Sequence, residues 1–347
     1  MKFGIWIGVL TLLAVGALYG PHVRVAPFVY EDDRLLQIAA DPVSWAGLRQ
    51  GRGLTMESWR TLRTPQASHA LNLGLHLAVV GLVGALLWQL TARADIALGV
   101  AAIVALHPLS VEGVAYAASR AELLAAVFVL LALVAATADV SWGWAAVPAL
   151  IGLAYLGKES GVVGIALIPL ALWLKGDRAW SARVAWLCVG VLVLLAVTAA
   201  PTLASWMHIG EGPQKSIDPD AWMAQQAVAT WRLVLLSVAP FWLSVAPDVT
   251  AASGWAQAGS ALLLVAILDV AWRCRRTAPL ATFGIVWCAL IVAPRFLIRT
   301  PWSPLNEHQF YLALPGMACC WVATLDVVER WLRATTWPAA LVPWEPR

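Results

Sequence analysis

The stretch from His107 to Leu124 carries ionisable side chains into sequence that is otherwise apolar, with Glu112, Arg120 and Glu122 inside it. A charged side chain at bilayer depth costs about 2.5–3.5 kcal/mol on insertion scales. These three groups should therefore face a protein interior or a water-filled cavity. We expect a polar site in this part of the chain.

A single helix over residues 107–136 would gather these side chains on one face. At about 100° per residue, Glu112, Tyr116 and Ser119 lie within about 60° of one another, with the arginine and the second glutamate on either side. Two interpretations remain open. The polar face lines a functional cavity, or it holds a buried Arg–Glu pair that only joins two helices.

The composition is that of a protein embedded in a membrane. Of its 347 residues, 61% are hydrophobic and 12% are charged, whereas about a quarter of a soluble domain is charged. Apolar runs that could cross a bilayer core of about 30 Å recur along the chain, so we predict an all-α polytopic membrane protein. The net charge of +3 comes from scattered basic residues and does not point to nucleic acid. The cysteines form no CxxC metal pattern or disulfide framework.

The apolar runs predict one domain over residues 1–333 with ten crossings, or eleven, and a short tail at 334–347. Segment 21–68 is too polar to cross, so it should lie on the outer surface as short amphipathic helices. Segment 205–254 should be external, with its apolar part a broken or re-entrant pass unless it is the eleventh crossing. The ten predicted crossings are residues 3–19, 69–93, 94–107, 107–136, 142–155, 161–174, 184–203, 257–270, 280–293 and 311–327.

Basic residues in the short loops set the expected orientation, because cytoplasmic loops carry an excess of Lys and Arg. If the crossings alternate, the basic loops share one side, which we take as the cytoplasm with both termini. The protein would then be a multi-pass protein of the cell (inner) membrane, and its acids would gather on the periplasmic or exterior side. The loop residues are Arg93, Lys175, Arg178, Arg183, Arg273, Arg275, Arg276, Arg330 and Arg333.

Three consecutive acids, Glu31, Asp32 and Asp33, follow the first predicted crossing. Neighbouring carboxylates repel one another, which favours a cation, a basic partner or a raised pKa. The alternative is a solvated N-cap for a helix that begins near Arg34. The three acids are therefore candidate site residues, and capping of a helix is the alternative.

His69, Asn72 and His76 lie on one face of the next helix, at spacings of three and four residues. Seven helical residues separate the two histidines by about 10 Å, which argues against one shared metal ion. The three side chains either hydrogen-bond between helices or line the cavity.

An outward-facing cavity with carboxylates and cations suits group transfer from a phosphate-activated donor. Such a reaction needs a base for the acceptor hydroxyl and fixed positive charge for the departing phosphate. Arginine matches phosphate oxygens with its planar donor fork. A divalent cation held by oxygen ligands could share the work, although no metal-ligand set is identified.

Several short motifs resemble the membrane O-mannosyltransferases that modify cadherins and their bacterial relatives, which are GT-C fold enzymes related to the protein O-mannosyltransferases. The central one is His107-Pro-Leu-Ser-Val-Glu112-Gly-Val with Ser119-Arg-Ala-Glu-Leu-Leu. Six others follow the family's order. They are Phe28-Val-Tyr-Glu-Asp, Trp59-Arg60-Thr-Leu, His69-Ala-Leu-Asn72-Leu-Gly-Leu-His76, Lys158-Glu159-Ser-Gly-Val, Pro240-Phe-Trp-Leu-Ser and Glu307-His-Gln-Phe-Tyr311-Leu.

The resemblance implies a GT-C-like bundle and an inverting glycosyltransferase that uses a polyprenyl-phosphate sugar, with a protein or glycan hydroxyl as acceptor. The family's acidic pair falls on Glu31 and Asp32, or on Asp32 and Asp33, so Asp32 is the base in either register. Charge and position assign Arg120, Lys158 and Arg60 to the donor phosphate. Glu112 and Glu159 would orient the first two of these cations, and the other cavity-lining residues would be His69, Asn72, His76, His107, Glu122, Glu307 and Tyr311.

The chain departs from the family pattern at His308, where the family has Arg, and at Ser110, where it has His. It also lacks the tetratricopeptide repeats that many members carry. A second hypothesis therefore stands beside the enzyme: a GT-C-like scaffold subunit without catalysis that packs against other membrane subunits. A transporter or channel is a third, which the predicted gathering of acids on one side disfavours.

Overall fold

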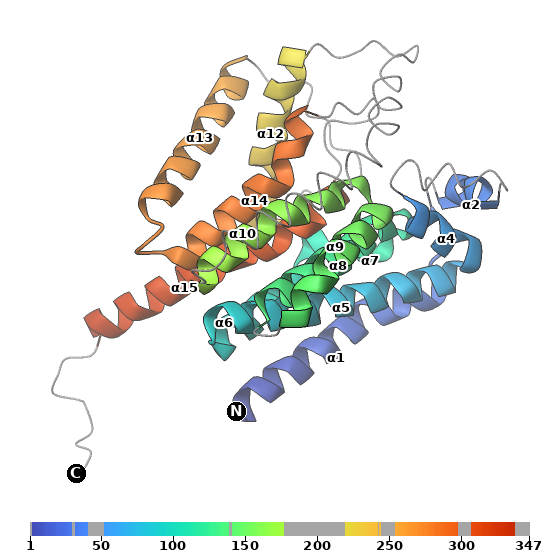
Figure 1. Ribbon diagram of the computed structural model, residues 1–347, viewed down its shortest axis with the longest axis horizontal. Helices are drawn as coiled ribbons and strands as arrows, with labels where there is room; N and C mark the ends of the chain where they lie inside the picture. Colours follow the sequence, from blue (N-terminus) through green and yellow to red (C-terminus); the bar gives the residue numbers. More distant parts are fainter. Residues whose placement is uncertain are drawn as a thin grey trace.

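The computed structural model describes residues 2–29, 32–40, 52–138, 141–176, 219–241, 243, 254–297 and 307–336. These residues form helices and no strand (Figure 1). The longer helices are α1 (Lys2–Val25), α5 (Pro65–Thr91), α6 (Ala94–Leu106), α8 (Arg120–Thr137), α9 (Ser141–Gly157), α10 (Gly164–Lys175), α12 (Pro219–Val238), α13 (Gly254–Arg273), α14 (Pro279–Leu297) and α15 (Leu314–Thr336). The short elements are α2 (Asp32–Ala40), α4 (Gly53–Thr61), η1 (Pro108–Ser110), α7 (Val111–Ala115), η2 (Ala117–Ser119), η3 (Glu159–Val163) and η4 (Glu307–Ala313).

The prediction of a helical, multi-pass membrane protein is confirmed. Within the described residues, six helices are long and apolar enough to cross a bilayer, and a seventh crossing results if α6 and the bent stretch after it count as one. These six lie in α1, α5, α8 with η2, α13, α14, and α15 with η4. The predicted count of ten or eleven is higher than this.

The remaining predicted crossings correspond to shorter helices or fall outside the described residues. The apolar part of α9 is Gly143–Gly157, and α10 has 12 residues, which span only about 18 Å of a core about 30 Å thick. The predicted crossing at 184–203 lies outside the described residues. In the 205–254 segment, α12 is a helix of 20 residues that ends before Pro240.

The predicted continuous helix over residues 107–136 is wrong, because the chain breaks twice before α8. Pro108 opens a 3-10 turn, and α6 and the following Pro108–Ala115 stretch are bent by 58°. Tyr116 then adopts an extended backbone (φ −95°, ψ 116°). Pro108 lacks the amide hydrogen that a helix interior needs. Glu112 and Arg120 therefore lie on separate elements, and the calculated helical face does not exist.

The bundle is centred on α8. In the most apolar part of this spanning helix, 72% of the residues are buried within the molecule. The corresponding share is 17% in α1 and 11% in α13. Figure 1 shows α13 at the edge of the bundle, beside α12 and α14. Glycine permits the close packing at the centre: a Cβ at Gly157 would lie 3.0 Å from the Ala125 nitrogen. The outer helices thus leave apolar side chains for lipid, while α8 sits in protein.

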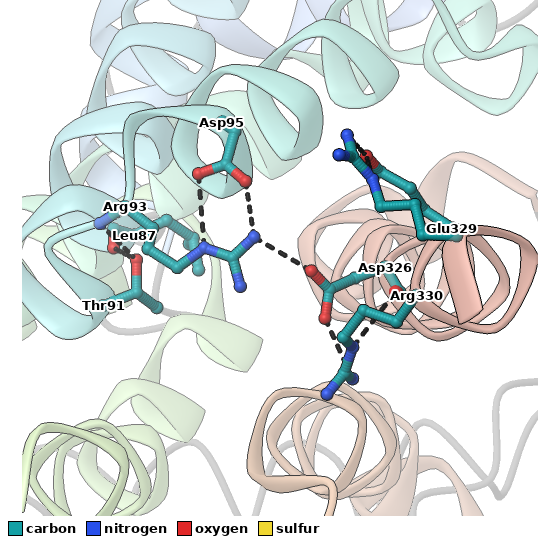
Figure 2. A network of polar contacts seen from close by, with 8 residues as sticks. Leu87, Thr91, Arg93, Asp95, Asp326, Glu329 and Arg330 are labelled. Carbon is teal, nitrogen blue, oxygen red and sulfur yellow. Dashed lines mark hydrogen bonds and ion pairs between the residues drawn. The ribbon is translucent and has the colours of Figure 1, made fainter. Parts of the chain in front are cut away.

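The two ends of the bundle carry different elements and different polar contacts. Figure 1 shows the start of α1, the α5–α6 turn and the end of α15 at one end, and α2, α4 and α7 at the other. At the first end, Arg93 bonds Asp95 and lies 2.9 Å from Asp326, which lies 3.0 Å from Arg330 (Figure 2). This network joins the α5–α6 turn to α15. The predicted membrane orientation of these ends stays a prediction.

The segment that was predicted to be external is shorter than 21–68. Helix α1 continues to Val25, and α5 begins at Pro65, after a Thr64 cap whose hydroxyl accepts from the Ala67 amide. Between them, α2 and α4 are the expected short helices, with Met56 and Trp59 buried. Residues 41–51, which include other predicted amphipathic positions, lie outside the described residues. At the C-terminus, α15 runs to Thr336, into the predicted tail.

Candidate functional site

Asp32, the predicted base, is fully buried at the start of α2. One carboxylate oxygen accepts from the Val29 amide at 3.0 Å, and the other from the Ala118 amide at 2.9 Å. Burial raises the pKa of Asp32 above its ordinary value, although the two amides and the nearby Arg120 act in the opposite direction. A carboxylate with a raised pKa is a stronger base, which suits proton abstraction.

The two described acids of this run, Asp32 and Asp33, do not share one environment. Asp33 is exposed, next to the buried Asp32, and Glu31 lies outside the described residues. Across the part of the chain that the structure describes, no three His, Cys, Asp or Glu side chains are placed to hold a metal ion. The described residues therefore offer no ligand set for a divalent cation, and of Asp32 and Asp33 only Asp32 is buried.

Arg120 is the first residue of α8, and its guanidinium is completely buried. Its Nε donates to Asn72 Oδ1 at 3.3 Å, and its Nη1 donates to Ser58 Oγ at 3.1 Å. The guanidinium carbon lies 4.5 Å from the centre of the Trp59 ring. Arg120 and Asp32 also attract each other electrostatically. The structure thus brings the predicted base and the predicted phosphate ligand together.

Helix α4 covers Arg120 and is bonded to the membrane bundle at several points. Besides the contacts of Ser58 and Trp59, the Thr55 hydroxyl donates to the Gly157 carbonyl at 2.6 Å. Arg52, just before α4, holds Glu159 with two hydrogen bonds of 3.0 and 2.8 Å. Burial alone would raise the pKa of Glu159, but Arg52 and Lys158 outweigh it and hold the pKa below its ordinary value.

Arg60 is not part of this group. Its side chain is 46% exposed and pairs with the exposed Glu57 on the same helix. Arg52, just before α4, is the arginine near this helix whose side chain is bonded to the bundle among the described residues. Arg60 lies on the outer side of α4, whose inner side carries Thr55 and Trp59. Helical periodicity would have separated these sides, whereas the motif alone did not.

Lys158 forms an ion pair with Glu122. Both side chains are largely buried, and Arg295 on α14 interacts electrostatically with the same carboxylate. Arg295 donates to Gln226 on α12 and to Gln309 in η4, and its guanidinium lies over the Phe310 ring. Glu122 is therefore a shared partner of two cations and does not pair with Arg120. Glu159 was expected to orient Lys158. Its hydrogen-bond partner is Arg52, and Lys158 acts on it only electrostatically.

Polar side chains of α1, α2 and α5 bond backbone groups that the broken helix leaves open. Asn72 Nδ2 donates to the Tyr116 carbonyl at 3.0 Å, and His22 Nε2 bonds the Ala115 carbonyl at 2.9 Å. With the Asp32 bond to Ala118, three side chains supply partners for this break. Backbone groups inside a membrane need such partners. His22 was missed from sequence because it was assigned to the external segment, beyond the first crossing.

Deeper in the bundle, His76 Nδ1 and the Tyr311 hydroxyl are 2.5 Å apart, and His76 Nε2 bonds the Ala105 carbonyl at 3.2 Å. The Tyr311 ring packs on Gly113, where a Cβ would lie only 2.7 Å from the ring. His107 lies elsewhere and bonds the Ser237 carbonyl of α12 at 3.1 Å. These residues join helices and are not shown to share one cavity with Arg120.

Glu112 binds His308, which begins η4 together with Glu307. It accepts from the His308 amide at 2.8 Å and contacts His308 Nδ1 at 2.7 Å. The Tyr116 ring meets the imidazole edge-on at 5.9 Å. Glu112 therefore secures η4 to α7 and does not orient Arg120 as expected. The side chain of Glu307 lies outside the described residues.

Four buried polar atoms around Arg120 have no hydrogen-bond partner among the described residues. They are Arg120 Nη2, Trp59 Nε1, Ser119 Oγ and His69 Nδ1. Such atoms are rare in folded proteins because each loses its bonds to water without replacement, at about 1–3 kcal/mol. We call these four atoms the Arg120 cluster. Two of them, Arg120 Nη2 and Trp59 Nε1, belong to side chains in contact and are donors open to a polar group. Ser119 belongs to the predicted polar face, whereas Trp59 stood in a short motif.

The comparisons with known proteins identify no relative: no family model, no curated protein and no solved structure matches the chain.

Proposed function

We propose that the protein is an inverting glycosyltransferase of GT-C type that transfers a sugar from a polyprenyl-phosphate donor to a hydroxyl on a protein or glycan. The reaction would take place at the outer face of the membrane, at the end of the bundle that carries α2 and α4. The observation that carries the proposal is the buried Arg120, which has an open donor atom and lies beside the buried Asp32. The ordered motif resemblance supports the same assignment.

In this reaction the acceptor oxygen attacks the anomeric carbon from the side opposite the phosphate. The new carbon–oxygen bond forms while the bond to the phosphate oxygen breaks, which inverts the anomeric centre. The acceptor proton passes to the Asp32 carboxylate, and the polyprenyl phosphate leaves as an anion. Arg120 Nη2 and Trp59 Nε1 are the donors available to that anion, and preorganised donors of this kind stabilise developing charge without reorganisation.

The experiment compares Asp32→Asn with Asp33→Asn, which differ by one position in the chain. Label from undecaprenyl-phosphate mannose is followed into the protein and glycan fraction of membranes that contain each variant. Asp32→Asn should reduce transfer by about 100-fold or more, because base catalysis contributes about 10²–10⁴-fold. Asp33→Asn should transfer as the wild type does, because its side chain is exposed. Equal transfer by all three proteins, with equal amounts folded, contradicts the assignment of the base.

One set of observations favours a second function, a scaffold subunit of a larger membrane complex. Glu122, Glu159 and Glu112 are each bonded to a basic side chain of another element. Asp32 also has a structural task at the broken helix. A scaffold would purify in mild detergent with a stoichiometric partner against its membrane face and without a bound polyprenyl phosphate. The isolated chain with a bound polyprenyl phosphate would exclude this alternative.

A further inference from the structure

His69 lies one helical turn before Asn72 on α5, and its side chain is completely buried. Its Nε2 is 3.4 Å from the Pro27 carbonyl. A carbonyl only accepts, so Nε2 carries the hydrogen of the neutral ring, and Nδ1 keeps a free lone pair. Nδ1 is also one of the atoms without a partner among the described residues. The ring therefore keeps a hydrogen-bond acceptor that no described residue fills.

The other three atoms without a partner can all donate a hydrogen bond. Trp59 Nε1 and Arg120 Nη2 only donate, and the Ser119 hydroxyl can donate or accept. The complementary ligand has acceptor oxygens for these donors and, next to them, a hydroxyl for His69. A phosphate alone matches the donors but offers no hydrogen to His69 when fully ionised. A sugar linked to a phosphate through its anomeric carbon has both parts.

Ring contacts and a shared face of α5 place His69 near Trp59 and Arg120. The Phe28 ring contacts both the Trp59 ring and the His69 ring, with centroid distances of 5.7 and 6.5 Å. Asn72 joins the same face of α5 to the Arg120 guanidinium, and His69 interacts electrostatically with Arg120. In an anomeric phosphate, the 2-hydroxyl is on the carbon next to the phosphate-bearing one. It is therefore the sugar hydroxyl closest to the groups that bind the phosphate.

We propose that His69 Nδ1 accepts a hydrogen bond from the 2-hydroxyl of the donor sugar and so selects donors that carry this hydroxyl, an inference that rests on the proposed glycosyltransferase function. His69 acts as a specificity-determining residue and takes no proton in the reaction. A buried acceptor that loses its only donor is costly, so a donor without the hydroxyl binds less tightly. Arg120 and Trp59 supply the affinity for the phosphate that all donors share.

The first test uses the wild-type protein and three lipids: undecaprenyl phosphate, undecaprenyl-phosphate mannose and the 2-deoxy analogue of the mannosyl lipid. The mannosyl lipid should bind about 10-fold more tightly than its 2-deoxy analogue, the effect of one hydrogen bond of about 1.4 kcal/mol. Equal affinity for the two sugar lipids overturns the role of His69 while leaving the proposed function intact. Failure of all three lipids to bind overturns the proposed function itself.

The second test compares His69→Phe with His69→Asn. Asparagine can place an amide oxygen near the position of Nδ1, whereas phenylalanine fills the space without an acceptor. His69→Phe should lose the preference for the 2-hydroxyl and keep wild-type affinity for undecaprenyl phosphate, and His69→Asn should keep most of the preference. If His69→Phe retains the full preference, the 2-hydroxyl is read elsewhere and the proposal is wrong. If His69→Phe does not fold, the wild-type comparison still decides.

Discussion

Two arginines at opposite ends of the bundle show how differently the protein uses the same side chain. Arg93 is 47% exposed and pairs with Asp95 and Asp326. Arg120 is fully buried, pairs closely with no carboxylate among the described residues, and has an Nη2 without a partner there. An exposed ion pair contributes about 0–1 kcal/mol, whereas a buried charge is costly unless its donors are satisfied. Burying Arg120 in this way is therefore unfavourable for folding, which favours a role in binding.

Arg120→Gln should have the largest effect on function. The variant removes the buried positive charge, so transfer from undecaprenyl-phosphate mannose should fall by about 100-fold or more, as when one oxyanion donor is removed from an enzyme. The measurement is the initial rate of transfer in proteoliposomes. The matched control is Arg93→Gln, which should keep the wild-type rate. A similar loss in both variants would mean that the comparison between the two ends is wrong.

Asp32→Asn tests the structural side of the same cluster. The asparagine side chain has one acceptor oxygen, so either the Val29 or the Ala118 amide loses its partner, at about 1–3 kcal/mol. At about pH 5, the melting temperature of Asp32→Asn should therefore be lower than that of the wild type. The raised pKa of Asp32 means that the folded protein holds this proton more tightly than the unfolded chain does.

It follows that the contribution of Asp32 to stability falls as the pH rises from the ordinary carboxyl range through the raised pKa. The difference in melting temperature between wild type and Asp32→Asn should shrink over this window. Melting curves recorded from about pH 4 to about pH 8 give this trend. A difference that grows with pH would show that the carboxylate is stabilised as an anion and would contradict the reading of Asp32 as a strong base.

Arg52→Gln tests the contact that closes the external segment onto the bundle. The low pKa of Glu159 is stabilising above the ordinary carboxyl pKa, and this contribution is lost as the pH falls through the lowered value. Because Arg52 is 42% exposed, the loss should be no more than about 1 kcal/mol at neutral pH. Melting temperatures of Arg52→Gln and wild type should converge in acid. A constant difference at every pH would exclude this ion pair as the cause.

Asp326→Asn should have the smallest effect. It removes the carboxylate between Arg93 and Arg330, which are exposed and screened by salt. The melting temperature should change by less than the equivalent of about 1 kcal/mol, and the change should disappear at high salt. Transfer should be unaffected. A large change in transfer would indicate that this end of the bundle is coupled to the site.

The sequence predicted those features that depend on a single property of the residues, such as hydrophobicity, spacing or charge. Apolar runs predicted the spanning helices, the i, i+3, i+7 spacing predicted that His69, Asn72 and His76 share a buried face, and charge in an apolar stretch identified Arg120. It failed at the break before α8, because helical periodicity assumes an unbroken backbone. That one error placed Glu112 on the same face as Arg120 and hid the contact between Glu112 and His308.

The partners across the bundle could not be predicted either. Lys158 pairs with Glu122 and Arg52 with Glu159, and such pairings depend on how helices pack, which a spacing rule does not contain. In the sequence, Trp59 stood in a short motif, and His22 lay in the segment predicted to be external. Trp59 joins the cluster because α4 folds over Arg120, and His22 reaches the break before α8 because α1 extends to Val25.

The most direct test is native mass spectrometry of the purified protein with equal amounts of undecaprenyl phosphate and phosphatidylglycerol. If the cluster around Arg120 binds a lipid-linked phosphate, the wild type retains one undecaprenyl phosphate per chain. Arg120→Gln should lose it, and Arg93→Gln should retain it. Equal retention by all three proteins, or no preference over phosphatidylglycerol, would contradict the assignment of this cluster as the donor site.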